Sequence, residues 1–558
     1  MSVVSTYAGK DGHARRRERY HEADVVVVGA GVLGCALAFA LANQGRSVLL
    51  LEHNMHEPDR IVGELMQPGG VASLRSLGLG ECVEGIDAVA CHGYHVVYDG
   101  DDIVIPYPPV DADGNVPMDA YVPGSSEEKQ RSEKRDGSGS SSKAPQGCSF
   151  HHGRFIMQLR RKCLAHTNIT VVETEVTGLI RGGPVPDEVL GVHTQTTVRL
   201  DGSPISRAEA AAAAKRDKET NAAVPSCPTT KTPDCFFGKL TVVADGYASR
   251  FRTEVLGNSA MVKSKFYALE LIDCPLEPKG FGHVFINSSA FPVLLYQIGT
   301  HETRALIDVP ANLPAASVAN GGVRGYIRNV VIPSLPKNIH ACVEEALADG
   351  KIPRSMPNSW LPPAPRSSIT KAANQGVILL GDAYNMRHPL TGGGMTVALN
   401  DALVISNLLA PDRVPDLGNH AAVARAMGDF HWTRKRLTSI INVLAQALYS
   451  LFAADSRPQR VLQQGCFKYF QRGWAAQPVG LLAGIIRKPL VLAYHFFSVA
   501  FLGIWLNSIE VMTGGSSSSS AASLVLGLFK LPLAIADGIL VLWTACIVFL
   551  PVFWRELR

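Results

Sequence analysis

The stretch from Ile378 to Asn400 places a carboxylate close to three consecutive glycines, a pattern that suits the binding of a nucleotide-like ligand. The apolar run before it predicts a buried strand that ends next to Asp382, and helical spacing resumes at Met395. The glycines, residues 392–394, leave backbone N–H groups and the positive end of the helix dipole free to face an anionic or electron-rich ligand. At a strand end, Asp382 can accept hydrogen bonds from the hydroxyl groups of a sugar. A capped glycine-rich turn would have the same local pattern.

The sequence GAGVLG predicts a dinucleotide-binding unit. Four valines precede it, a helical pattern follows it, and a second apolar strand is closed by Glu52. Strand, G-x-G-x-x-G, helix, strand and acid stand at the spacing that such a unit needs. In this unit Gly29 permits the tight turn, Gly31 lets the backbone approach a pyrophosphate, and Gly34 lets the helix pack on the strand. Glu52 can hold a ribose hydroxyl.

These groups need a sheet that brings its strand ends together. The sequence TVVADG predicts a third buried strand, ending at Asp245, before a helix with Arg250 and Arg252 in its first turns. Ligands of open α/β sheets bind at the carboxyl ends of strands. We therefore expect Gly29, Asp245 and Asp382 to meet at one crevice. Residues 262–310 alternate apolar and polar, which predicts an antiparallel sheet forming the wall of a substrate domain.

Several polar residues have no chemistry that can be assigned from their spacing alone. Gln67 is expected to be a loop amide and Tyr94 a strand tyrosine. Four more are expected in a loop or on a solvated helix face: His151, His152, Arg154 and Arg160.

Composition narrows the class of protein. The chain of 558 residues predicts two or three packed regions, and its net charge of +4 is spread out, so nucleic acid is not indicated as a partner. The basic run Arg15 to Arg19 is expected to be a solvated tail. The eleven cysteines form no C-x-x-C pair and no ligand set, so no metal site is predicted. With no apolar segment near the first residues, reduced thiols and a cytosolic bulk are expected.

The C-terminal region is markedly hydrophobic. Leu437 to Phe452 predicts an apolar helix, and two longer apolar stretches follow, Pro478 to Leu506 and Leu524 to Trp554. Crossing a bilayer takes about 20 apolar residues, and charged residues interrupt both stretches. Two interpretations stay open, a helical hairpin that crosses the membrane and helices that lie in one leaflet. Buried core helices of a soluble protein are a third, weaker one.

These patterns divide the chain into alternating regions. The dinucleotide-binding α/β region is expected in four separate segments, with two low-complexity insertions of mobile surface chain, the second containing a helix-forming Ala-Lys-Glu run. The expected regions are a basic mobile tail (1–22), a first α/β segment (23–110), an insertion (111–149), a second α/β segment (150–202), an insertion (203–234), a third α/β segment (235–260), the substrate domain (261–365), a fourth α/β segment (366–430) and a membrane-associated helical region (431–558).

Longer motifs resemble the squalene monooxygenase (squalene epoxidase) family, of the fungal kind without an N-terminal membrane helix. The motifs are GAGVLG, GELMQPGG, FHHGRFIMQLR, TVVADG, LLGDAYNMRHPLTGGGM, NVLAQALYSLF, PVGLL and PLVLAYHFF. They run from residue 24 into the C-terminal region and fail only in the two insertions. The resemblance implies a Rossmann-like, GR2-type FAD-dependent monooxygenase fold, with the four α/β segments binding FAD.

The resemblance also implies roles for particular residues. Val32 and Leu33 would lie at the pyrophosphate of FAD, and Gln67 and Tyr94 would be a hydrogen-bonded pair that sets the active-site side of the flavin. In relatives this tyrosine is tied to inhibition by allylamine-type compounds. The other residues implied to contact FAD are Glu52 and His53 at the adenosine ribose, Arg60 and Arg160, Val176 beside the adenine, and Asp382, Gly394 and Met395 at the ribityl chain and flavin.

The activity implied is epoxidation of squalene to (S)-2,3-epoxysqualene with O2, in the biosynthesis of sterols such as ergosterol. Electrons would come from NADPH through NADPH-cytochrome P450 reductase. The implied location is the endoplasmic reticulum membrane, with the catalytic domain facing the cytosol and lipid droplets as a second location. Two alternatives stay open: another membrane-associated isoprenoid flavoenzyme, such as a geranylgeranyl reductase, and a flavin-free prenyl-lipid carrier.

Overall fold

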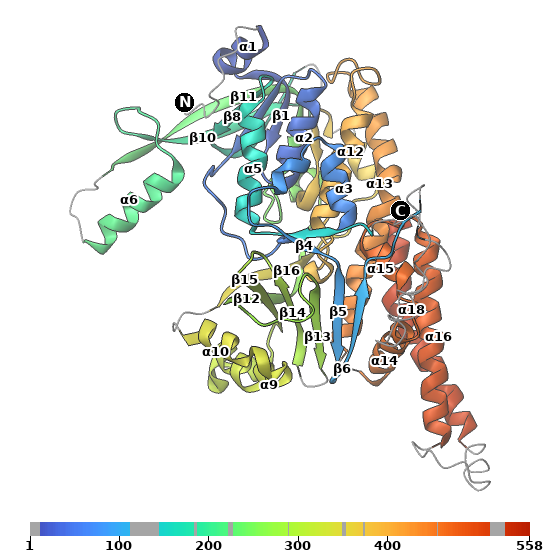
Figure 1. Ribbon diagram of the computed structural model, residues 1–558. Helices are drawn as coiled ribbons and strands as arrows, with labels where there is room; N and C mark the ends of the chain where they lie inside the picture. Colours follow the sequence, from blue (N-terminus) through green and yellow to red (C-terminus); the bar gives the residue numbers. More distant parts are fainter. Residues whose placement is uncertain are drawn as a thin grey trace, which may run out of the picture.

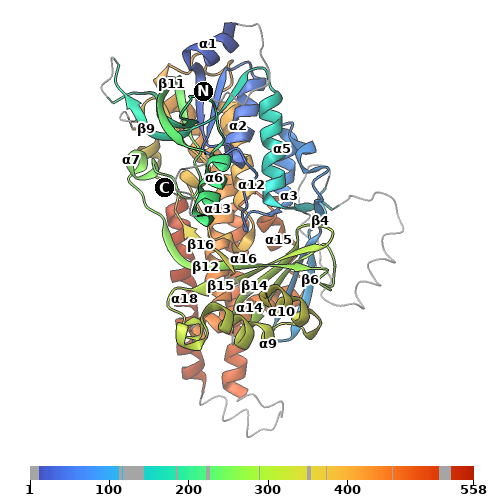
Figure 2. The same ribbon diagram turned by 90° about the vertical axis from the view of Figure 1, so that its left-hand side faces the viewer.

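The computed structural model describes residues 12–111, 116, 144–183, 187–220, 227–287, 290–348, 353–371, 374–454, 456–513 and 530–557. Two seven-stranded sheets follow one another along the molecule, with a group of C-terminal helices beside the second sheet (Figures 1 and 2). The first insertion, expected at 111–149, lies largely outside the described residues, but its last three residues form a short strand, β7.

The first sheet carries the dinucleotide-binding pattern. Its parallel strands are rich in Val, Ile and Leu, and they are buried because helices cover both faces. The strand order is β8 (Ile169–Glu173), β2 (Val48–Glu52), β1 (Glu22–Val28), β11 (Thr229–Val243), β10 (Val189–Arg199) and β9 (Glu175–Arg181), with β17 (Val377–Leu379) also paired to β11. The helices that matter for the site are α2 (Val32–Asn43), α5 (His152–Ala165), α7 (Arg252–Leu256) and α12 (Gly394–Leu408). The predicted α/β fold is confirmed.

The second sheet is antiparallel except where β5 and β13 run parallel. Its order is β16 (Arg354–Trp360), β12 (Met261–Ile272), β15 (Glu302–Pro310), β14 (Ala290–Gln297), β13 (Gly282–Asn287), β5 (Gly93–Tyr98) and β6 (Asp101–Pro106). The antiparallel wall predicted for residues 262–310 is therefore confirmed. The structure differs for β5 and β6, which were expected in the first α/β segment, residues 23–110. They extend this sheet because β5 pairs with β13 and packs its alternate apolar residues into the hydrophobic core beneath the second sheet. A third, small sheet joins β3 (Leu65–Met66), β7 (Gly147–Ser149) and β4 (Val89–Cys91).

The C-terminal helices are α13 (His420–Phe452), α14 (Arg457–Gln471), α15 (Ala476–Leu482), α16 (Pro489–Thr513) and α18 (Leu531–Leu557). Among the described residues, α16 and α18 are each long and apolar enough to cross a membrane. They form a hairpin whose far end projects beyond the second sheet, and α18 brings the chain back to α13 (Figure 1). The apolar helix expected from Leu437 is the second half of α13, so a boundary at residue 430 falls inside one continuous helix.

Two segments expected to be mobile are ordered. The basic run at the start belongs to helix α1 (Gly12–Tyr20), where the Arg17 guanidinium is buried and donates to the Thr170 hydroxyl at 3.0 Å. A solvated tail was the wrong expectation for this run because one of its arginines has buried partners. Residues 203–234 hold the predicted helix, α6 (Arg207–Glu219), within an arm closed by the β10–β11 hairpin (Figure 1). The pairing of β10 with β11 and the capping box of α6 stabilise regular structure in a segment that its composition alone indicated to be mobile.

Candidate functional site

The glycine loop between β1 and α2 has the geometry that its sequence predicts. Gly29 has a φ of 102°, in the region that glycine adopts at low cost, and its N–H donates to the Leu51 carbonyl at 2.7 Å. A Cβ on Gly34 would lie 1.9 Å from the Gly29 oxygen, so the helix can approach the strand only with glycine there. A Cβ on Gly31 would meet no atom within 4 Å, so the backbone at this position faces open space.

Glu52 and Arg160 hold this loop through hydrogen bonds to the backbone of Ala30. The Glu52 carboxylate accepts the Ala30 N–H at 2.7 Å, and the Arg160 Nε donates to the Ala30 carbonyl at 3.0 Å. Burial acts to raise the pKa of Glu52, but the His53 hydrogen bond, the Arg160 charge and the Ala30 N–H bring it below its ordinary value. Glu52 is therefore an ionised acceptor beside the glycine loop. Arg160 is buried against the loop, which excludes the solvated helix face that its spacing alone allowed.

His53 and Val176 lie around Glu52. The His53 Nδ1 is 2.6 Å from the Glu52 carboxylate, with the ring 60% exposed. The Thr174 N–H donates to the Glu52 carbonyl at 2.8 Å, and Val176 follows two residues later, buried in β9. The residues implied for the adenosine half of FAD thus gather at the ends of β2 and β9.

Arg252 joins the two other strand-end turns. Its guanidinium donates to the carbonyls of Asp382 and Ala383, both at 3.0 Å, and to those of Gly246 and Tyr247, at 3.2 and 2.9 Å. The turn that contains Asp382 is therefore tied to the turn after β11. The sequence placed Arg252 in the first helical turns, but nothing in its spacing indicated this bridge.

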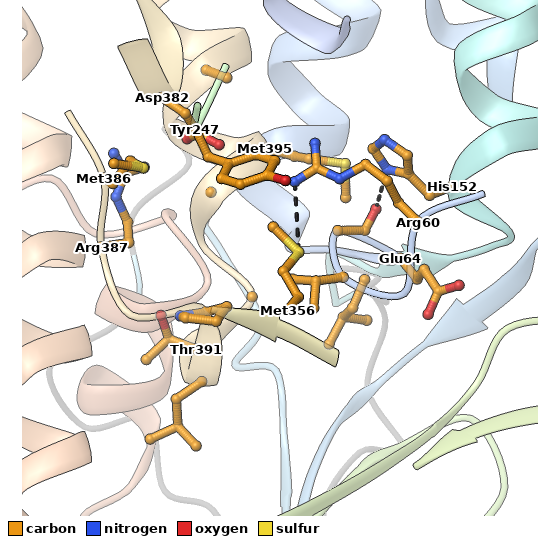
Figure 3. Close-up of a pocket in the computed structure, with 18 of the residues that line it drawn as sticks. Arg60, Glu64, His152, Tyr247, Met356, Asp382, Met386, Arg387, Thr391 and Met395 are labelled. Atoms are coloured by element: carbon orange, nitrogen blue, oxygen red, sulfur yellow. Dashed lines mark hydrogen bonds between the residues drawn. The ribbon is translucent and has the colours of Figure 1, made fainter. Parts of the chain in front are cut away.

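A cavity opens where these strand ends meet the second sheet, and Figure 3 shows the residues around it. Eight predicted residues line it: Gly31, Val32, Leu33, Arg60, Tyr94, Asp382, Gly394 and Met395. Eight other predicted residues are not among those that line it: Gly29, Gly34, Glu52, His53, Gln67, Arg160, Val176 and Asp245. Ala244 and Gly246 line the cavity, whereas the Asp245 carboxylate between them accepts the Arg250 N–H at 3.1 Å.

Gln67 and Tyr94 are hydrogen-bonded, as the resemblance implies. The Gln67 amide nitrogen donates to the Tyr94 hydroxyl at 2.5 Å and to the Thr391 carbonyl at 3.0 Å, next to the triple glycine. The Tyr107 hydroxyl donates to the Gln67 amide oxygen at 2.7 Å. All three side chains are buried, and desolvation raises the pKa of both tyrosines, so the hydroxyls are neutral. Tyr107 was not predicted, because it stands 40 residues from Gln67 with no motif around it.

Other cavity residues were also missed. His152, expected in a loop, is buried at the start of α5 and donates from Nδ1 to the Gly63 carbonyl at 2.8 Å. Burial and the Arg60 charge lower the pKa of His152 to about 3, so the ring is neutral. The Arg60 guanidinium lies 5.5 Å from the centre of the Tyr247 ring (Figure 3). Glu64 is buried in a bidentate ion pair with Arg304 of β15, at 2.8 and 2.9 Å.

The residues present fit FAD. Open backbone at Gly31 and Gly394 leaves the N–H groups of the glycine loop and of the α12 start accessible to the anionic and electron-rich parts of that cofactor. The match of residues 24–58 to the "FAD dependent oxidoreductase" family supports the same assignment.

Solved structures with this fold include a monooxygenase and a protein solved with FAD. p-Nitrophenol 4-monooxygenase PnpA of Pseudomonas putida superposes with a TM-score of 0.55 at 15% identity, over 83% of this chain and 98% of that one. HpxO of Klebsiella pneumoniae, solved with FAD, superposes with a TM-score of 0.52 at 16% identity, over 84% and 99%. The chain has the fold of the FAD-dependent monooxygenases, and it is an enzyme that uses FAD.

More similar sequences narrow the class. The family described as "Squalene epoxidase" matches residues 237–518. Squalene epoxidase ERG1 of Gibberella zeae is 57% identical over 99% of both chains, and squalene epoxidase erg1 of Aspergillus fumigatus is 46% identical over 97% of this chain and 95% of that one. The mouse squalene monooxygenase is 40% identical over 86% of this chain and 70% of that one. The chain belongs to the squalene epoxidase family.

Proposed function

We propose that this enzyme epoxidises squalene to (S)-2,3-epoxysqualene with O2, in sterol biosynthesis. The proposal rests on the cavity between the two sheets, whose two sides differ in chemistry. One side presents the FAD-binding groups, and the side formed by the second sheet is mostly apolar, with Val284, Leu294, Leu306 and Met356. A hydrocarbon substrate has no polar handle, so an apolar wall facing the flavin is what it requires. Family membership supports the same substrate.

FAD, when bound and reduced, supplies the activation of O2 that lets one oxygen atom pass to an electron-rich alkene while the other leaves as water. The chain has to position the groups and exclude water. The glycine loop binds the pyrophosphate, Asp382 accepts hydrogen bonds from the ribityl hydroxyls, and the N–H groups at the start of α12 face the flavin. Gln67 and Tyr94 keep one side of the cavity dry, because their polar atoms are already hydrogen-bonded and buried.

Electrons would reach the flavin from NADPH through NADPH-cytochrome P450 reductase. The sequence holds one G-x-G-x-x-G unit that follows a strand, and this unit is assigned to FAD. An external donor that docks on the cytosolic face is consistent with that single unit.

The enzyme would be attached to the endoplasmic reticulum membrane through the hairpin of α16 and α18, with lipid droplets as a second location. Asp537 of α18 forms a bidentate pair with Arg457 of α14, at 2.7 and 2.9 Å, and accepts from Asn507 of α16 at 2.6 Å. His495 of α16 bonds Tyr469 and Gln477, both at 2.8 Å. Each hairpin helix is thus joined by polar contacts to α14 or α15, so these polar groups are paired within the protein. The substrate would enter from the bilayer.

The test is turnover of the detergent-solubilised protein with squalene, NADPH and added P450 reductase, with products read by mass spectrometry. A gain of one oxygen atom that requires both O2 and the reductase supports the proposal. Bound flavin with a saturated product would identify an isoprenoid reductase instead. A preparation without flavin would favour a lipid carrier.

A further inference from the structure

The last turn of α18 reaches the flavin site through buried hydrogen bonds. The Glu556 carboxylate is 3% exposed and accepts from the Asn442 amide nitrogen of α13 at 2.8 Å. The same nitrogen donates to the Asn385 side-chain oxygen at 3.0 Å. Both acceptors use lone pairs, so the Asn442 amide has to present its NH2 group to each of them. One amide therefore bridges the end of the hydrophobic hairpin and the segment that follows Asp382.

Asn385 connects Asn442 to residues that line the cavity. Its side-chain oxygen also accepts from the Arg387 guanidinium at 3.0 Å, and its N–H donates to the Gly381 carbonyl at 2.9 Å. Arg387 and Asp382 both line the cavity, and Figure 3 shows Arg387 beside Met386 on one side of it. The turn that carries Asp382 and the side chain of Arg387 are thus held by one asparagine.

Charge supports the same connection. Arg387, Arg434 and Lys435 are buried around Asn442, and the Asp401 carboxylate pairs with Arg434 at 2.6 Å. Glu556 is the other buried carboxylate that interacts with these three cations. Several cations in a buried site repel one another unless anions offset them. Burial raises the pKa of the Glu556 carboxyl group, while the Asn442 hydrogen bond and the three cations act to lower it.

We propose that Glu556 is a positioning residue for FAD. Through Asn442 and Asn385 it holds Asp382 and Arg387 in place, so this contact between the last turn of α18 and α13 sets how tightly FAD binds. The inference rests on the proposed position of FAD beside Asp382. It gives the C-terminal hairpin a role in the flavin site in addition to attachment to lipid.

The experiment measures FAD affinity from flavin fluorescence on release and recombination, together with the visible spectrum of the bound flavin. Glu556→Ala should weaken FAD binding about tenfold, the size expected when one buried hydrogen-bond donor loses its acceptor. Glu556→Gln keeps an acceptor for Asn442 and should restore most of the affinity. Asn442→Ala should match Glu556→Ala, and the double variant should be no weaker than either, since both act through one bridge.

Asp537→Asn is the matched control. Asp537 is an acid of the same helix with partners on α14 and α16, 19 positions from Glu556, or about 28 Å along the helix. It loosens the hairpin without touching the bridge, so it should leave FAD affinity unchanged. Wild-type affinity in Glu556→Ala, or equal loss in Asp537→Asn, overturns the proposal. Should Glu556→Ala fail to fold, wild-type FAD affinity in a folded Asn442→Ala variant overturns it as well. Asp382→Ala tests the proposed FAD site separately from the role of Glu556. If this variant still binds FAD, the proposed position of the cofactor beside Asp382 is wrong.

Discussion

Replacing Arg252 tests whether the strand-end turns must be joined for FAD to bind. Arg252 is 5% exposed and donates to four carbonyl oxygens at 2.9 to 3.2 Å, two on each turn. A lysine keeps the charge but has a single nitrogen in place of the planar fork, so it can serve one turn. Losing two of the four bonds at about 1.5 kcal/mol each gives about 3 kcal/mol. If the whole loss falls on the cofactor site, FAD affinity drops roughly a hundredfold.

The assay for Arg252→Lys is a titration of apoprotein with FAD, followed by flavin fluorescence, with thermal unfolding as a check that the variant folds. Arg250→Ala is the matched control, because Arg250 is two residues away and its 63% exposed side chain pairs with Glu175. A pair of that kind contributes little, so affinity should change by less than about threefold. If folded Arg252→Lys binds FAD as tightly as Arg250→Ala does, the bridge between the turns is not what holds the cofactor.

Three other outcomes are expected. Tyr94→Phe should retain FAD and change turnover or allylamine inhibition, and unaltered kinetics and inhibition would remove Tyr94 from the site. Its matched variant Tyr107→Phe leaves the buried Gln67 oxygen unpaired, so it should lower the unfolding free energy by about 1–3 kcal/mol. Because the pKa of His152 is about 3 in the folded protein, against about 6.5 unfolded, the native state binds fewer protons between these values and stability falls as pH drops through this window. His152→Gln should therefore reduce the slope of unfolding free energy against pH by about 1.4 kcal/mol per pH unit between pH 4 and 6, and an unchanged slope in denaturant titrations would contradict a neutral buried ring. Trp505→Ser with Trp543→Ser, at positions 65% and 64% exposed on the hairpin, should cut partition into lipid vesicles at least tenfold, with Leu200→Ser on the β10–β11 arm as the control that should not.

The cofactor half of the site could be predicted because its pattern is local. Gly29, Gly34 and Glu52 lie within one strand–helix–strand unit, so the spacing of a few glycines and one acid defines the turn, the helix packing and the position of the proposed ribose acceptor together. The strand ends at Asp245 and Asp382 followed from apolar runs in the same way. What spacing could not show was which way the Asp245 side chain turns, since that depends on the Arg250 N–H in the following turn.

The residues that were missed are buried polar groups whose partners are far away in the sequence. Arg17 bonds Thr170 across 153 positions, and Arg252 bonds Ala383 across 131. An arginine in a helix is ordinarily solvated, and only the tertiary partner reverses that expectation. Hydrophobic periodicity does not detect such pairs, because the cost of burying each arginine is offset by acceptors on segments that only the tertiary fold brings close.

The Gln67–Tyr94 pair shows what geometry adds to a resemblance. Family motifs alone singled out the two residues, 27 positions apart, as partners. The structure shows that the second hydrogen of the Gln67 amide is held by the Thr391 carbonyl, 324 positions away and next to the triple glycine. The amide can therefore neither flip nor move without disturbing the start of α12. A single side chain thus couples the second sheet, through Tyr94, to the helix whose N–H groups we propose to face the flavin. For this reason the loop geometry at Gly392 and the position of Tyr94 should respond together to a change at Gln67.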